Sequence, residues 1–171
     1  MLITGPPGVG KTTLIRKLSQ ELRYFHPVGF YTEEIREKGI RKGFELISLD
    51  GRRGLLSYTD VKSLYRVGKY KVDVKGFEEF LSTIPFLNPS TRLIIIDEIG
   101  KMECSSDQFK KLIRELFDSE KQVIATIALK GSGLIEEIKR GQDITFFEMT
   151  KSNRDSLLSD ILKEVIPGEG Q

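Results

Sequence analysis

The chain has 171 residues, a length that suits one domain with a substantial core and leaves little room for two. Its 27 basic and 25 acidic residues nearly cancel, so no overall charge marks it as a nucleic-acid or membrane binder. Cys104 and His26 are the only cysteine and histidine, which excludes an internal disulfide and a multi-cysteine zinc site. No segment approaches the roughly 18 apolar residues of a membrane span, and no basic-then-apolar leader is present, so we expect a cytoplasmic protein.

The first half of the chain predicts a strand, a helix and then an antiparallel region. Residues 1–4 form a short apolar strand, and a helix is predicted after the glycine-rich loop by apolar residues at helical spacing: Leu14, Ile15, Leu18 and Leu22. Residues 28–35 predict a second strand. Turns at 38–39, 42–43 and 50–51 favour an antiparallel hairpin region, inserted at about 36–66, in which residues 44–48 and 55–58 are extended.

The second half alternates between strands and helices. Residues 70–74 alternate as a strand, and Phe77, Phe80, Leu81 and Ile84 predict a helix that Pro85 closes. The remaining elements are a buried strand at 93–96, a helix at 109–117 with a capping box from Ser105 to Gln108, a strand at 122–129, a short helix at 134–138, a strand at 144–149 and a helix at 157–165. We expect residues 168–171 to fray. The whole predicts one α/β domain over 1–171, in which helices cover both faces of a mainly parallel sheet in three layers.

The loop between the first strand and the first helix reads G-P-P-G-V-G-K-T and matches a Walker A phosphate-binding loop. A glycine-rich turn that merely joins two elements is the alternative, but the flanking strand and helix favour the phosphate loop. Backbone amides and the helix dipole then hold the phosphates, Lys11 contacts the outer phosphates as a catalytic cation, and Thr12 is a ligand of Mg²⁺. The predicted nucleotide-binding residues of this segment are Gly5, Pro6, Pro7, Gly8, Val9, Gly10, Lys11, Thr12 and Thr13.

Two acidic residues follow the apolar run at 93–96 and match the end of a Walker B strand. We expect Asp97 to face the loop and help to hold Mg²⁺ together with Thr12. Glu98 is then free to orient and deprotonate an attacking water, which requires a carboxylate that is not committed to the metal. The alternative for Glu98 is an exposed acid at the end of a strand. Both residues are counted among the predicted nucleotide-binding residues.

Three further residues are candidates for nucleotide contacts. Thr126, near the end of a later strand, either senses the outermost phosphate or fills the strand as a β-branched residue. Asn153 and Arg154 follow the last strand, where such folds commonly contact the base, although Thr150 or Ser152 there equally serves as the cap of the last helix. Arginines of the insertion either form a lid over the site or are solvated turn residues: Arg36, Arg41, Arg52 and Arg53.

Five stretches together resemble one known family. They are G-P-P-G-V-G-K-T-T-L at 5–14, G-F-Y-T-E-E at 29–34, V-G-K-Y-K-V-D at 67–73, I-D-E-I-G-K-M-E at 96–103 and T-K-S-N-R-D at 150–155. Over nearly its whole length the chain is similar to the small P-loop nucleoside-triphosphatases, found in thermophiles and called cancer-related nucleoside-triphosphatase in the animal form. The resemblance implies a RecA-like core with a strand between the two Walker segments. It leaves several residues without a role: Tyr31, Glu33, Glu34, Tyr70, Asp73, Lys101 and Glu103.

The resemblance also implies Mg²⁺-dependent hydrolysis of several nucleoside triphosphates, including ATP, GTP, CTP and UTP, to the diphosphate and phosphate. We expect a monomer with a nucleoside-triphosphate substrate and no membrane partner. A nucleotide or nucleoside kinase is the first alternative, and a nucleotide-gated module that binds RNA or a protein is the second. An arginine that speeds phosphoryl transfer is supplied by Arg154, by the insertion or by a partner, or it is lacking altogether.

Overall fold

The computed structural model describes residues 1–141 and 143–166, and within these residues nine strands form one sheet. The strands are β1 (Leu2–Thr4), β2 (Val28–Glu37), β3 (Ile40–Ser48), β4 (Arg53–Tyr58), β5 (Arg66–Val67), β6 (Tyr70–Val72), β7 (Leu93–Ile99), β8 (Gln122–Ile127) and β9 (Phe146–Glu148). The helices are α1 (Lys11–Glu21), α2 (Val74–Ser82), α3 (Asp107–Phe117), α4 (Leu134–Lys139) and α5 (Leu157–Val165), with 3₁₀ turns η1 (Arg23–Phe25) and η2 (Glu103–Ser105). None of the described helices combines the length and apolar composition that crossing a membrane requires.

The sheet joins a parallel half to an antiparallel half at β2. Its strand order is β5-β6-β4-β3-β2-β7-β8-β1-β9. Strands β2, β7, β8, β1 and β9 run parallel, whereas β2 pairs antiparallel with β3, and β4, β6 and β5 continue that pattern. Because β8 lies between β1 and β7, one strand separates the strand before the phosphate loop from the strand that carries Asp97. The predicted α/β class and the inserted strand are therefore confirmed.

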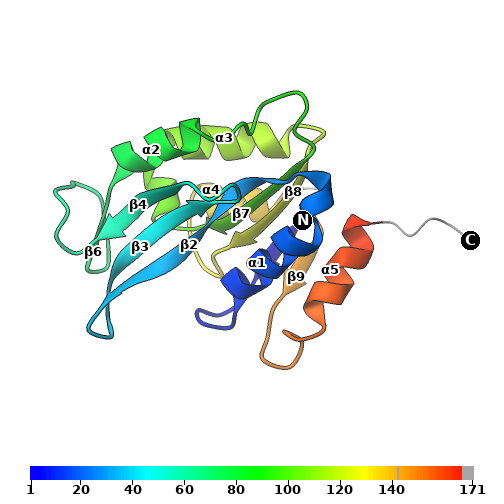
Figure 1. The fold of residues 1–171 in the computed structure, drawn as a ribbon, viewed down its shortest axis with the longest axis horizontal. Coiled ribbons are helices and arrows are strands. Elements are labelled where there is room, and N and C mark those ends of the chain that lie inside the picture. Colours follow the sequence, from blue (N-terminus) through cyan, green and yellow to red (C-terminus); the bar gives the residue numbers. More distant parts are fainter. Residues whose placement is uncertain (142, 167–171) are drawn as a thin grey trace, which may run out of the picture.

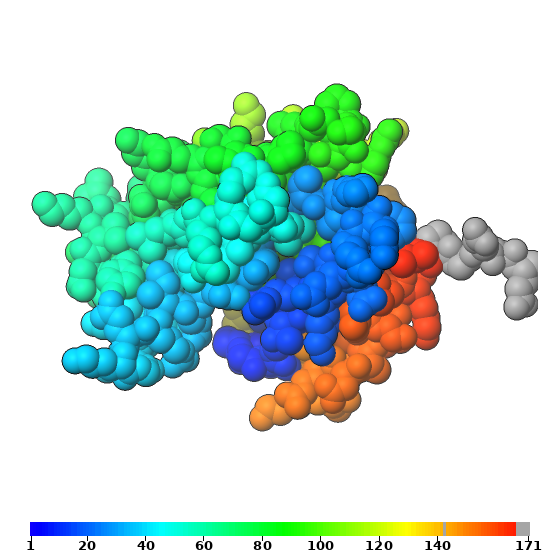
Figure 2. Space-filling view, in the orientation of Figure 1, coloured from blue at the N-terminus to red at the C-terminus, as the bar shows by residue number. Residues whose placement is uncertain are grey.

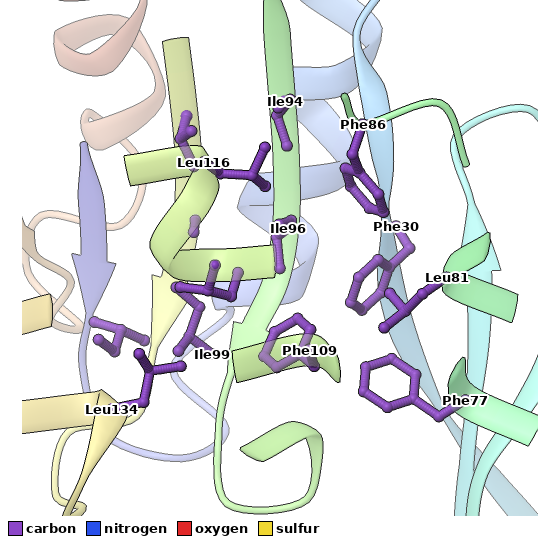
Figure 3. Packing of buried hydrophobic residues seen from close by; sticks show 14 of the residues in the cluster. Phe30, Phe77, Leu81, Phe86, Ile94, Ile96, Ile99, Phe109, Leu116 and Leu134 are labelled. Atoms are coloured by element: carbon purple, nitrogen blue, oxygen red, sulfur yellow. The ribbon is translucent and has the colours of Figure 1, made fainter. Parts of the chain in front are cut away.

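Helices cover both faces of the sheet, as the alternation of elements predicts (Figure 1). Side chains on β7 point alternately to the two faces: Ile94 and Ile96 pack with α2, α3 and α4, and Leu93 and Ile95 pack with α1 and α5. In the first cluster, the ring of Phe30 on β2 meets phenylalanine rings of α2 and α3 edge-on, with centroids 5.9 to 6.4 Å apart (Figure 3). The result is a three-layer α/β structure.

Most predicted elements lie where the hydrophobic periodicity places them, but the boundaries of the insertion differ. The antiparallel part of the sheet reaches Val72 on β6, beyond the predicted limit of about 66, and the two-residue strand β5 was not predicted. Val74 begins α2 instead of ending a strand, because the Asp73 side chain accepts a hydrogen bond from the Gly76 amide and caps the helix. The predicted fraying at 168–171 lies outside the described residues.

The predicted capping box of α3 is wrong by one residue. The hydroxyl of Ser106, not of Ser105, accepts a hydrogen bond from the Phe109 amide at 3.0 Å. The 3₁₀ turn η2 takes up residues 103–105, so the amino-terminal cap lies one position later than the predicted Ser105. Ser106 is fully buried and also donates to Glu78 of α2, which ties the start of α3 to the neighbouring helix.

One acidic side chain lies inside the fold. Glu103 of η2 is only 4% exposed, and the ion pairs of the described residues do not include it. Burial raises the pKa of Glu103 well above its ordinary value, and the Glu98 carboxylate adds to the shift. The folded protein therefore binds this proton more tightly than the unfolded chain does. Stability should fall as the pH rises above the pKa of an unfolded glutamate.

Replacement of Ser106 by alanine should lower the free energy of unfolding by about 0.5 to 2 kcal/mol, because the Phe109 amide loses its buried acceptor. The same change at Ser105 is the matched control, and we expect it to alter stability by less than about 0.5 kcal/mol. Urea unfolding followed by circular dichroism measures both. Equal losses of stability in the two variants would show that Ser106 is not the cap of α3.

Glu103→Gln should stabilise the fold at pH 8 and have little effect at pH 4.5. The gain over wild type should grow by at most about 1.4 kcal/mol for each pH unit above the ordinary glutamate pKa, until the folded-state pKa is reached. Urea unfolding at several pH values measures this difference, with Glu79→Gln at an exposed site of α2 as the control. A gain in stability that is the same at every pH would show that ionisation of Glu103 does not destabilise the folded protein.

Candidate nucleotide-binding site

The phosphate loop connects the end of β1 to the first residue of α1, as the sequence predicts. Gly5 and Gly10 have φ angles of 153° and 114°, which side chains on L-residues rarely adopt. A Cβ atom on Gly5 would lie 2.5 Å from the Met149 carbonyl oxygen, so glycine is also required by the close approach of the segment after β9. No side chain caps the amino terminus of α1, and no acidic residue lies in its first turn. Its first amides are therefore left for an anion.

The Lys11 side chain lies across this loop. Its Nζ atom donates to the carbonyl oxygens of Gly5 at 3.0 Å and Pro6 at 3.4 Å. The ammonium group is thus held beside the turn that the backbone amides line. This places a positive charge where an anion bound by the loop would need it.

A hydrogen bond joins the end of the phosphate loop to β7, a strand from a distant part of the sequence. Thr12 Oγ1 donates to Asp97 Oδ2 at 2.5 Å, and Thr126 Oγ1 on β8 donates to the other oxygen, Oδ1. Asp97 is 2% exposed, and burial raises the pKa of this carboxyl, whereas the two hydroxyls, the nearby Lys11 charge and the Thr32 amide oppose that rise. Asp97 therefore faces the phosphate loop, as the sequence predicts.

The sequence left two alternatives for the role of Thr126. The residue is fully buried and does not line the cavity beside the loop. Its hydroxyl is engaged with Asp97, so it orients the carboxylate from behind. A direct contact of Thr126 with a phosphate group stays a prediction.

Glu98 points to the same region without sharing the bonds of Asp97. It lines the cavity beside Lys11 and Asp97. Burial, and then the charge of Asp97, raise the pKa of Glu98 above its ordinary value, and Lys11 opposes the shift. The exposed strand-end alternative does not describe this partly buried side chain.

A cavity of about 530 Å³ lies beside these groups and continues into the antiparallel half of the sheet. Its wall includes the phosphate loop, the ends of β7 and β8, and residues of the four strands β2, β3, β4 and β5. Figure 2 shows a notch between the β2–β3 hairpin, in light blue, and the phosphate loop, in dark blue, along the lower edge of the molecule. Neither Cys104 nor His26 lines this cavity, and burial raises the pKa of the Cys104 thiol to about 12.

The segment after β9 is closed by hydrogen bonds of its own. Asn153 Oδ1 accepts from the Thr150 amide at 2.8 Å, and Asn153 Nδ2 donates to the Glu148 carbonyl at 2.8 Å. Helix α5 then begins after Ser156, so neither Thr150 nor Ser152 is its amino-terminal cap. The Arg154 side chain is 54% exposed, and neither it nor Asn153 lines the cavity. Their contact with a nucleotide base stays a prediction.

The four arginines of the insertion have different environments. Arg52 pairs with Asp50, and Arg53 pairs with Glu45, both outside the cavity wall. Arg36 and Arg41 share Glu34, but only Arg41 of the four lines the cavity.

Arg41 Nε also donates to the Tyr70 hydroxyl at 2.7 Å, and its guanidinium lies over the Phe44 ring. The sequence did not predict this arrangement. Arg41 contacts residues of other strands, and no pattern in the sequence near Arg41 indicates those contacts. Glu34 and Tyr70 belong to the stretches at 29–34 and 67–73, which were the only hint.

The comparisons with known proteins agree with this geometry. A sequence profile of the family described as NTPase matches residues 1–162. The chain is 51% identical over 163 residues to nucleoside-triphosphatase THEP1 of Thermotoga sp. (strain RQ2), covering 95% of this chain and 92% of the relative. It is 42% identical over 180 residues to the human cancer-related nucleoside-triphosphatase, covering 95% and 94%.

A solved structure shows the same fold. The crystal structure of THEP1 from the hyperthermophile Aquifex aeolicus superimposes with a TM-score of 0.86 at 38% sequence identity, covering 96% of this chain and 97% of that one. The match to the family profile, residues 1–162, includes both Walker segments and all nine described strands. The chain belongs to the NTPase family.

Proposed function

We propose that this protein hydrolyses nucleoside triphosphates, ATP, GTP, CTP and UTP among them, to the diphosphate and phosphate in a Mg²⁺-dependent reaction. The observation that carries the proposal is the bond between Thr12 and Asp97, because it brings the phosphate loop and the acidic strand end to one point. The names of the relatives support hydrolysis as the reaction class. The range of bases rests on the family resemblance.

The residues at this point suit magnesium. A hydroxyl and a carboxylate are hard oxygen donors, which Mg²⁺ prefers. No group of three or more histidine, cysteine or acidic residues able to hold a metal occurs in the part of the chain that the structure describes. That fits an ion held by Thr12, Asp97 and the phosphates of the substrate, since Mg²⁺ rarely takes an all-protein cage. When bound, it would neutralise charge on the phosphate oxygens.

The protein's own groups then bind the phosphates, stabilise the developing charge and accept the proton. The loop amides and Lys11 bind the phosphates and stabilise the charge that develops when the terminal phosphoryl group is transferred. Glu98 orients a water molecule and accepts its proton. Because burial raises the pKa of Glu98, this carboxylate is a better proton acceptor near neutral pH than an exposed glutamate.

Lys11→Ala should weaken binding of the triphosphate about ten- to hundred-fold, since the variant loses a charge-assisted contact of about 1.5 to 3 kcal/mol. Calorimetric titration with Mg²⁺ and a non-hydrolysable ATP analogue measures this. Lys17→Ala, on the exposed side of the same helix, is the matched control. An affinity equal to that of wild type would remove Lys11 from the phosphate site.

Glu98→Gln should keep triphosphate affinity and lose at least about a hundred-fold in phosphate release, the usual contribution of a general base. Release from each of the four nucleoside triphosphates, with and without Mg²⁺, checks the reaction and its metal requirement. Glu136→Gln, a change at a half-buried position on α4 that does not line the cavity, is the control. Unimpaired release by the Glu98 variant would assign proton transfer to another group.

A further inference from the structure

The cavity beside the phosphate loop extends well past the groups that a triphosphate requires. Following the strand order from β1, it passes the end of β7 and then meets Thr32 and Glu34 on β2, Phe44 on β3, Leu56 on β4 and Val67 on β5. These strands lie progressively farther from the loop. The cavity therefore has a loop half near Lys11 and an inner half within the antiparallel sheet.

Part of the lining of the inner half is apolar. Its wall includes Phe44, Leu56, Val67 and Met102. Phosphate oxygens gain nothing from such a surface, because they need donors and cations. The inner half thus suits the carbon skeleton of an organic molecule.

Two carboxylates that line the cavity, those of Glu98 and Glu103, lie close to each other. A Cβ atom built on Gly100 would lie 2.7 Å from Glu98 Oε1 and 2.8 Å from Glu103 Oε2, so both acids converge on one point. Glu103 is 4% exposed but lines the cavity, and no basic side chain of the described residues pairs with it. Because Glu103 lines the cavity, its carboxyl can share a hydrogen bond with a hydroxyl group bound there.

The distribution of charge disfavours an anion in the inner half. Lys101 and Lys130 follow β7 and β8, at the same edge of the sheet as the phosphate loop. Among the described basic residues of β2 to β5, only Arg41 lines the cavity, and Glu34 already pairs with it at 2.6 Å. Arg41 and Glu34 thus cancel, so the lining strands of the inner half, as far as the structure describes them, offer an anion no net positive charge.

We propose that the inner half is a second-substrate site for a small neutral alcohol, whose apolar body lies on Phe44, Val67 and Met102 and whose hydroxyl meets the Glu98–Glu103 pair. The alcohol takes up the terminal phosphoryl group in competition with water. This inference rests on the proposed function, because the donor is the nucleoside triphosphate of the same site.

The transfer balances without a further reactant. A bond forms between the hydroxyl oxygen of the alcohol and the terminal phosphorus, and the bond from that phosphorus to its bridging oxygen breaks. The nucleoside diphosphate leaves with the bridging oxygen. The hydroxyl proton passes to Glu98 and then to solvent, and the product is a phosphate monoester.

Methionine methyl NMR tests occupancy of the inner half. The chain has three methionines, and of these Met102 lines the cavity, whereas Met1 and Met149 do not. Protein saturated with Mg²⁺ and a non-hydrolysable ATP analogue is titrated with 2-phenylethanol, with thymidine and with thymidine 5′-monophosphate. We expect saturable shifts of the Met102 signal alone, with the anionic probe requiring about ten-fold higher concentration.

A partition assay tests the acceptor role. With Mg²⁺ and ATP, ³¹P NMR compares the phosphate monoester formed from each neutral probe with the free phosphate released. Val67→Trp fills the inner half and should lower the ratio of monoester to phosphate about ten-fold. Leu64→Trp, at a fully exposed position three residues earlier, is the matched control and should keep the wild-type ratio.

Several results would overturn the proposal. A Met102 signal that none of the probes moves, or equal shifts of all three methionines, would exclude a specific site. Binding of a neutral probe without monoester, or an unchanged ratio in Val67→Trp, would exclude the acceptor role. If the protein released no phosphate from any triphosphate, the proposed function would fail, and the methyl shifts would still decide whether the inner half binds an alcohol.

Discussion

The hydrogen bond between Thr12 and Asp97 is the constraint on which the site depends. It connects the first turn of α1 to the end of β7, 85 residues later in the chain. One strand, β8, lies between β1, which leads into the phosphate loop, and β7, which carries Asp97; the Thr126 hydroxyl of β8 donates to the other oxygen of the same carboxylate. The sheet order therefore fixes how far the acid stands from the phosphate loop, and the two hydroxyls fix its orientation.

Much of this arrangement was predictable because it follows from local pattern and one rule of topology. The glycines before Lys11, the apolar strand before them and the helical spacing after them each have a local physical cause. Asp97 and Glu98 end a buried parallel strand, and the carboxyl ends of parallel strands lie at one edge of a sheet. The meeting of loop and acids needed no further information.

What could not be predicted depends on contacts between residues far apart in sequence. Nothing near Thr126 indicates that its hydroxyl is turned to Asp97, and nothing near Arg41 indicates its hydrogen bond to the Tyr70 hydroxyl, 29 residues later in the chain. The cap of α3 moved to Ser106 because a 3₁₀ turn intervenes, and two residues suffice to form β5. The inner half of the cavity exists only because the antiparallel strands continue the sheet beyond β2.

The structure keeps the buried Glu103 and the partly buried Glu98 near Asp97, which is expected to hold a metal. Burying acids in this way costs stability, so we expect function to require it. The most direct test is a crystal structure of the protein with Mg²⁺ and a non-hydrolysable ATP analogue. The account predicts the outer phosphates within the loop of residues 5–12, the metal ion on the Thr12 hydroxyl, and Asp97 beside it. Phosphates bound away from this loop, or a metal ion remote from Thr12 and Asp97, would contradict it.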